Sequence, residues 1–123
     1  MTMKRILLVF CLALVPMLAS AASAHKHTKV WNDATRLAAL LSDVQHTANF
    51  EAATWKVVAN EANTLANRIY AGASGKTARE TAKDLRTHVR QMRSAAMSGD
   101  AASARTHAGQ AQPYVYQMID WSM

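Results

Sequence analysis

Two histidines, His25 and His27, are spaced so that they could hold a transition metal at the start of a processed chain. They follow a string of small residues, and cleavage after Ala24 would leave His25-Lys26-His27 as the new amino terminus. The free amine, the next two backbone amides and the imidazole of His27 then supply four nitrogens in one plane, a geometry that Cu(II) and Ni(II) favour. Copper or nickel is therefore the candidate metal.

The metal motif depends on a leader. Residues 1–24 have the pattern of a secretory signal peptide: Lys4 and Arg5 precede an apolar run over residues 6–18, and small residues follow. The run is too short to span a bilayer. The single cysteine, Cys11, falls within it. We expect residues 1–24 to be removed and the product to be periplasmic or secreted from a bacterium.

Cleavage has two acceptable positions. A cut after Ala24 makes His25 the first residue, whereas a cut after Ala22 leaves Ser23 first and places His25 third. Either start resembles the amino-terminal copper- and nickel-binding peptides, in which the third residue is histidine. The alternative is that histidines near a solvated terminus have no metal function.

A second candidate site is a run of basic residues at steps of four and three, which places them on one face of a helix. This basic ridge could hold phosphates, anionic lipid headgroups or an acidic partner. The alternative is a solvated helix face, because Glu80 and Asp84 are interspersed in the same segment. Nucleic acid is not expected, because the segment has neither stacking aromatics nor a groove-reading motif. The ridge consists of Arg79, Lys83, Arg86, Arg90 and Arg93.

The sequence patterns of catalysis are missing. No Gly-x-Ser-x-Gly, His-Glu-x-x-His or paired-carboxylate pattern occurs. Gly75-Lys76-Thr77 is similar to the end of a phosphate-binding loop, but Tyr70 stands where that loop needs glycine. We expect a binding protein rather than an enzyme, with an envelope or extracellular partner.

Three further histidines, His46, His88 and His107, fall within helical segments. Asp43 precedes His46 by three residues and Asp84 precedes His88 by four, so each pair could meet on a helix surface. We interpret both pairs as surface hydrogen bonds, because the Glu-x-x-His repeats of di-metal bundles do not occur.

The elements that must position these residues are helices. The chain has 123 residues, a net charge of +6 and 50% hydrophobic residues, which suits one domain over residues 25–123. Apolar residues recur at steps of three and four, the spacing of one helix face. Four such stripes occur: Val30, Ala34, Leu37, Leu41, Val44 and Ala48; Trp55, Val58, Ala62, Leu65 and Ile69; Ala78, Ala82, Leu85, Val89, Met92 and Ala96; and Ala101, Ala104, Ala108, Ala111, Val115 and Met118.

The breaks between the stripes carry residues typical of helix ends. Their short length predicts antiparallel neighbours, and so an all-α, up-down-up-down four-helix bundle. We expect this bundle to be a monomer without a membrane span. Within the last stripe, Pro113 removes an amide and crowds the carbonyl of Gly109, which predicts a kink or restart near Tyr114. The helix-end residues are Asn49 as a cap, Gly72 in the left-handed conformation, Thr77 with Glu80 as a capping box, and Gly99 followed by Asp100.

Three tryptophans stand out in so short a chain. Trp55 opens the second stripe and should be buried, while Trp31 should lie near one end of the bundle. Trp121 with Tyr114 and Tyr116 forms an aromatic C-terminal segment, which we interpret as a lid over the bundle end; the alternative is an exposed docking patch.

The Gly99-Asp100 turn into an alanine-rich last helix that ends in aromatics is similar to the exported four-helix bundles of the cytochrome b562 and cytochrome c′ group. That resemblance implies a haem pocket, with Met118 as the axial ligand. The chain departs from the group in two respects: it has no Cys-x-x-Cys-His for covalent haem, and no histidine near the end of the last helix.

Overall fold

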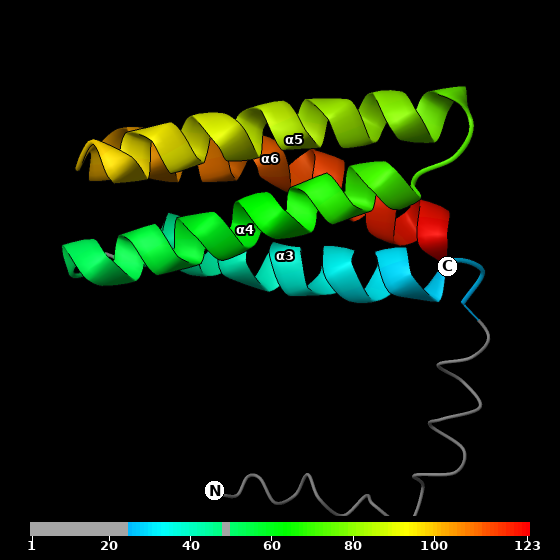
Figure 1. Cartoon of the computed structure of the whole chain (residues 1–123), viewed down its shortest axis with the longest axis horizontal. Helices are drawn as coiled ribbons and strands as arrows, with labels where there is room; N and C mark the ends of the chain where they lie inside the picture. Colours follow the sequence, from blue (N-terminus) through cyan, green and yellow to red (C-terminus); the bar gives the residue numbers. More distant parts are fainter. Residues whose placement is uncertain (1–24, 48–49) are drawn as a thin grey trace, which may run out of the picture.

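The computed structural model describes residues 25–47 and 50–123, and these form four helices. The helices are α3 (Thr28–His46), α4 (Ala52–Gly72), α5 (Lys76–Met97) and α6 (Ala101–Ser122). They lie side by side along the long axis of the molecule (Figure 1). Each packs mainly on two neighbours, since α3 and α5 both contact α4 and α6. The expected all-α fold with four helices is confirmed, whereas the expected signal peptide lies outside the described residues.

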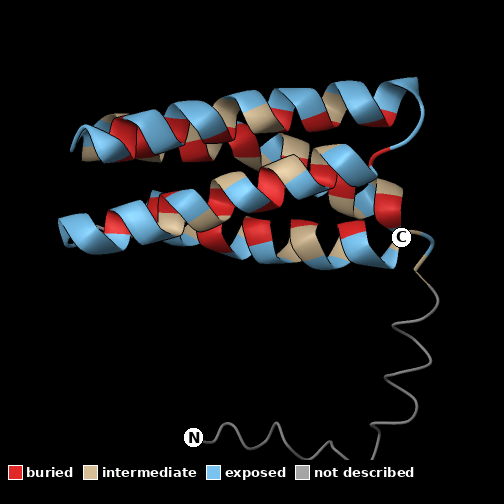
Figure 2. Ribbon diagram, viewed as in Figure 1, coloured by how far each residue is buried: buried red, intermediate tan, exposed pale blue. Residues whose placement is uncertain are grey.

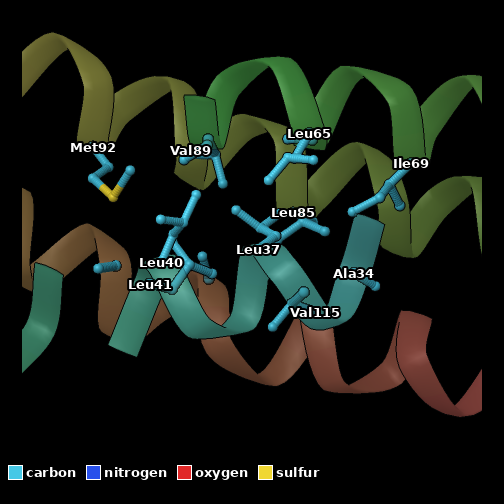
Figure 3. Close-up of a cluster of buried hydrophobic side chains, with 14 of the residues drawn as sticks. Ala34, Leu37, Leu40, Leu41, Leu65, Ile69, Leu85, Val89, Met92 and Val115 are labelled. Carbon is cyan, nitrogen blue, oxygen red and sulfur yellow. The ribbon is translucent and has the colours of Figure 1, made fainter. Parts of the chain in front are cut away.

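The four apolar stripes form the core. Buried residues face inward on every helix and exposed residues cover the outside (Figure 2). Leucines of α3 meet apolar side chains of the other three helices at the centre (Figure 3). Of the expected stripe residues, Val58 and Ala101 are only half-buried, and Ala48 lies outside the described residues. The core also takes in residues beside the stripes, namely Leu40, Ala59, Ala66, Ala73 and Ala95.

Helix α6 continues through Pro113, so of the kink or restart expected near Tyr114, the restart does not occur. A proline inside a helix costs about 3 kcal/mol. Val115 and Met118, just beyond it, are fully buried, and burial of such side chains stabilises by about 1.5–3 kcal/mol each. Keeping the stripe in register through Pro113 therefore outweighs the loss of one backbone hydrogen bond, and the proline ring itself is exposed.

Among the helix ends that the structure describes, expectation and structure agree at the junction of α5 and α6. After α5, Gly99 has φ +80°, and the amides of Gly99 and Asp100 donate to the carbonyls of Ala96 and Ala95. This is the Schellman arrangement, which needs a residue in the left-handed region. Asp100 then caps α6, because its carboxylate accepts the amide of Ser103 at 3.0 Å.

Two other helix-end predictions are wrong. Gly72 is the last residue of α4 and does not adopt the left-handed conformation; a Cβ there would lie 2.7 Å from Val30 Cγ2, so glycine allows the close approach of α3. Thr77 and Glu80 form no capping box, because α5 begins one residue before Thr77 and its N-cap is Gly75, with φ +85°. The expected cap Asn49 lies outside the described residues, and Glu51 stands at the N-cap of α4.

The ends of α3 and α6 are joined at both extremities. The amide of His27, which precedes α3, donates to the carbonyl of Ser122 at the end of α6, at 3.0 Å. At the opposite extremity, Arg105 Nη1 near the start of α6 donates to the carbonyl of Thr47, which follows α3, at 3.3 Å. Among the helices that the structure describes, none is long and apolar enough to cross a membrane.

Candidate functional site

The basic ridge lies on the flank of α5 that faces α4. Its members follow the buried stripe of α5 by one position along the helix, a rotation of about 100°. Contacts confirm the direction, because Arg79 and Arg86 reach Tyr70 of α4, and Arg93 reaches Asn60 of the same helix. The ridge therefore borders the seam between α4 and α5.

Tyr70 receives two guanidinium groups at one end of the ridge. The guanidinium carbon of Arg79 lies 4.4 Å from the ring centroid and that of Arg86 lies 3.9 Å from it. Arg79 Nη1 also donates to the carbonyl of Ala73 at 3.2 Å, which holds it beside the ring. A hydrogen bond and the charge of Arg79 lower the pKa of the Tyr70 phenol, with smaller contributions from the charges of Arg86 and Lys83. This end of the seam thus has a positive potential.

At the other end of the ridge, the arginines contact asparagine side chains of α4. Arg93 Nε donates to Asn60 Oδ1 at 2.7 Å, and Arg90 Nη2 approaches Asn67 Oδ1 at 3.5 Å. Asn63 lies between Asn60 and Asn67 along α4, and its Oδ1 is buried without a hydrogen-bond partner. The three asparagines and Tyr70 recur at steps of three and four along α4, so one polar edge of α4 faces the ridge.

No residue of this polar edge was among the site residues predicted from the sequence. Asn60, Asn63, Asn67 and Tyr70 repeat with the same period as the apolar stripe of their helix, which is the signal that could have revealed them. Spacing alone, however, does not tell which neighbouring helix such an edge faces. The pairing of α4 with α5 supplies that information.

The carboxylates that form ion pairs lie between α3 and α4, away from the ridge. Within residues 25–47 and 50–123 two ion pairs are found, Arg36 with Glu61 at 2.9 Å and Arg68 with Asp33 at 2.8 Å. Both join α3 to α4. Helix α4 therefore offers charged partners to α3 but neutral amides and an aromatic ring to α5, so no ion pair of the described residues neutralises the ridge.

The two acidic residues of α5 do not interrupt the ridge. Glu80 and Asp84 follow Arg79 and Lys83 by one residue, which turns each away from its cation by about 100°. Both carboxylates are exposed. Among the described residues, neither carboxylate forms an ion pair with the ridge. Glu80 lies three residues before Lys83 and therefore borders the ridge on the helix surface.

The candidate metal ligands are both stacked on tryptophans. The His25 ring lies on Trp31 with centroids 4.0 Å apart, and the His27 ring lies on Trp121 at the same distance with an interplanar angle of 5°. In a chain that starts at His25, metal binding would need the deprotonated amide of His27, yet that amide donates to Ser122 in the structure. Metal coordination and this terminal clasp, made by His27, Trp121 and Ser122, are mutually exclusive at the His27 amide.

His46 and His88 make contacts that differ from the expected pairs with Asp43 and Asp84. His46 Nδ1 lies 3.0 Å from the carbonyl of Ser42 instead of approaching Asp43. The His88 ring stacks on Tyr114 of α6 with centroids 5.5 Å apart, and its Nδ1 is buried without a hydrogen-bond partner. His107 contacts Gln110 one helical turn further on.

The C-terminal aromatic segment is divided between core and surface. Tyr114 and Trp121 are half-buried against the core, as the lid interpretation requires, whereas Tyr116 is 53% exposed. Trp55 is buried as expected and meets Phe50 edge to face, while Trp31 is half-buried beside His25.

Met118, the implied haem ligand, is fully buried within the stripe of α6. Val115 and Ala111, its neighbours in that stripe, are fully buried as well. A haem beside Met118 would have to displace this packing, so the residues present do not fit the cofactor.

No three metal-ligating side chains gather in the part of the chain that the structure describes.

Comparison with models of protein families, with curated proteins and with solved structures finds no match to this chain.

Proposed function

We propose that the protein is an exported, non-catalytic, monomeric binding module whose four helices run up-down-up-down. Export is supported by the charged, apolar and small segments of residues 1–24. The topology is supported by the contacts that place the start of α3 beside the end of α6 and the end of α3 beside the start of α6. The short connections are those of neighbouring antiparallel helices.

We further propose that the module binds an anionic partner in the cell envelope or outside the cell through the basic ridge. The observation that carries this proposal is the neutral polar edge of α4. Arginines that meet asparagine and tyrosine keep their full positive charge, whereas an ion pair would cancel it. The net charge acts in the same direction by attracting anions over a longer range: it is +6 for the whole chain and +4 once Lys4 and Arg5 are removed with residues 1–24.

Heparin, a sulfated polyanion, is a suitable first probe. The test compares the purified protein with the charge-reversal variant Arg86→Glu/Arg90→Glu on immobilised heparin, with the salt concentration at elution as the readout. We expect the variant to elute at much lower salt, because each lost cation removes one contact to the polyanion and its released counterion.

A matched control separates the ridge from net charge. Lys26→Glu/Lys29→Glu makes the same change in charge at two exposed residues outside the ridge. Elution of this control close to the wild-type position supports the ridge. Equal shifts for both double variants, with circular dichroism showing both folded, would reduce the interaction to overall charge.

The alternative function is Cu(II) or Ni(II) binding through the mature amino terminus, with His25 and His27 as ligands. Its support is the spacing of these histidines and the closeness of both to a proposed cleavage site. One extra residue ahead of the mature terminus displaces the amine and the histidine from their positions in the site. Such an extension should abolish the visible absorption band of square-planar copper if the motif is responsible.

A further inference from the structure

The Tyr70 end of the basic ridge differs from the rest. Arg79, Lys83 and Arg86 are four and three residues apart, so all three lie on the same side of α5 within about 10 Å along its axis. Two of the three guanidinium and ammonium groups contact one aromatic ring. Like charges this close repel one another, and an anion between them would relieve the repulsion.

Hydrogen-bond acceptors are scarce at this end. Arg90 and Arg93 have amide oxygens of Asn67 and Asn60 as partners. Arg86 instead lies over the face of Tyr70. A ring face attracts a cation but is a poor acceptor for the five N–H groups of a guanidinium. Arg86 thus retains donors that a ligand could use.

The arrangement is also held in place before any ligand arrives. Arg79 is fixed by the carbonyl of Ala73 and by the ring, and Tyr70 is half-buried in the seam between two helices. Side chains that are already ordered lose little conformational entropy when they bind. A hydrogen bond from Arg79 and the charges of Arg79, Arg86 and Lys83 lower the pKa of the Tyr70 phenol, which agrees with three cations gathered at this point of the surface.

We propose that Arg79, Lys83 and Arg86, together with the Tyr70 hydroxyl, form an oxyanion site for a phosphate monoester group. This inference rests on the function proposed above and names the ligand chemistry at one end of the ridge. A phosphate monoester carries nearly two negative charges at pH 7 and three terminal oxygens. Three cations and a phenol match both the charge and the number of acceptors better than they match a carboxylate, and arginine pairs with phosphate oxygens in bidentate fashion.

The first arm of the test measures binding of inorganic phosphate by titration calorimetry at low ionic strength, with protein purified from cells that express the full chain. The variant Arg79→Gln/Arg86→Gln should lose at least about ten-fold in affinity, since hydrogen bonds to charged groups are strong. Tyr70→Phe keeps the ring and should lose a few-fold, which provides a second readout if the arginine variant fails to fold.

Two comparison variants locate the effect. Lys26→Gln/Lys29→Gln removes the same charge outside the ridge and should leave phosphate affinity unchanged. Arg90→Gln/Arg93→Gln removes two positive charges from the other end of the ridge, and should lower phosphate affinity clearly less than Arg79→Gln/Arg86→Gln does. Equal losses in the two ridge variants would overturn the oxyanion site while leaving the ridge as an anionic surface.

The second arm distinguishes the source of the phosphate group. Phosphatidylcholine vesicles that contain phosphatidic acid carry a monoester, whereas those that contain phosphatidylglycerol carry a diester of lower charge. Preference for phosphatidic acid, competed by inorganic phosphate, would support a lipid headgroup; phosphate binding without vesicle binding would support a soluble ligand. Heparin binding without phosphate binding would overturn this inference alone, and the loss of both would overturn the proposed function as well.

Discussion

Tyr70 is the residue at which the charges of the ridge become measurable. Its phenol lies against Arg79 and Arg86, and Lys83 acts on it from the same helix. No other tyrosine in the chain has such a pair of guanidiniums over its ring among the described contacts. A probe of Tyr70 ionisation therefore reports the potential at the candidate site in the absence of any ligand.

The midpoint of the Tyr70 titration, its pKa, should lie below the ordinary tyrosine value of about 10. The cause is the hydrogen bond and charge of Arg79, which favour the phenolate. Subtracting the ultraviolet titration of Tyr70→Phe from that of the wild type isolates this group, and Arg79→Gln should move the curve back upward. Because the folded pKa is the lower one, ionisation favours the folded state above the ordinary value, and that contribution is lost as pH falls through the folded pKa. A Tyr70 curve at or above the ordinary value would contradict the contact.

Gly72 tests the packing of α3 on α4 at the scale of one methyl group. Gly72→Ala would place a Cβ 2.7 Å from Val30 Cγ2, a side chain with little rotational freedom. We expect the free energy of unfolding to fall by about 1–3 kcal/mol, as for other overpacked sites. Urea denaturation measures the change.

Gly109→Ala is the matched control for that substitution. Its Cβ would meet the far end of Gln45 at 3.2 Å, which can move aside, and alanine gains about 1 kcal/mol over glycine inside a helix. This variant should be neutral or stabilising. A Gly72→Ala protein as stable as the Gly109→Ala protein would show that the two helices do not approach as described.

Helix ends offer a test at the scale of the element. Asp100→Ala removes a side-chain acceptor from the first turn of α6 and should destabilise by about 0.5–2 kcal/mol. Thr77→Ala should change stability by less than about 0.5 kcal/mol, because Thr77 is exposed and caps nothing. Thermal denaturation compares the stabilities of the two variants directly. A larger loss of stability in Thr77→Ala than in Asp100→Ala would indicate that Thr77 caps α5, as its sequence predicted.

The stripes of each helix were predictable because burial leaves a period of 3.6 in the sequence. Every stripe residue of α5, from Ala78 to Ala96, is buried, and Ala95 beside the stripe is buried as well. The failures have local causes that the period does not contain. Gly72 serves a contact with Val30 some forty positions earlier, and Gly75 takes the N-cap position that the pattern assigned to Thr77.

The candidate site, too, was only partly predictable from the sequence. The ridge was visible from its spacing, since five cations at helical steps need no knowledge of other elements. Its surroundings were not, because the polar edge of α4 acquires meaning only when α4 is known to pack on α5 with Asn60 opposite Arg93. Whether a cation is neutralised is thus a property of helix pairing rather than of the helix that carries it.

At the scale of the whole molecule, the terminal clasp links the proposed metal site to stability. In a chain that begins at His25, the unfolded terminus can bind Cu(II) freely, whereas the folded state must first release the amide of His27 from Ser122. A ligand that binds the unfolded state more tightly lowers stability by mass action. Copper should therefore lower the melting temperature of this protein, as followed by circular dichroism.

The control for the copper effect is His27→Ala, which lacks the third-position imidazole and should show no further decrease when copper is added. A rise in melting temperature with copper in the wild type would mean that the folded chain builds the metal site, contrary to the described clasp.

The ridge of α5 has no carboxylate partner on α4, and we propose that it binds an anionic partner. The most direct measurement is the change in backbone amide chemical shifts while a heparin oligosaccharide is added to the isotope-labelled protein. We expect the shift changes to gather on α5 around Arg79 to Arg93 and on the facing edge of α4 from Asn60 to Tyr70. Shifts gathered instead at the terminal clasp, or on the exposed aromatic face around Tyr116, would contradict it.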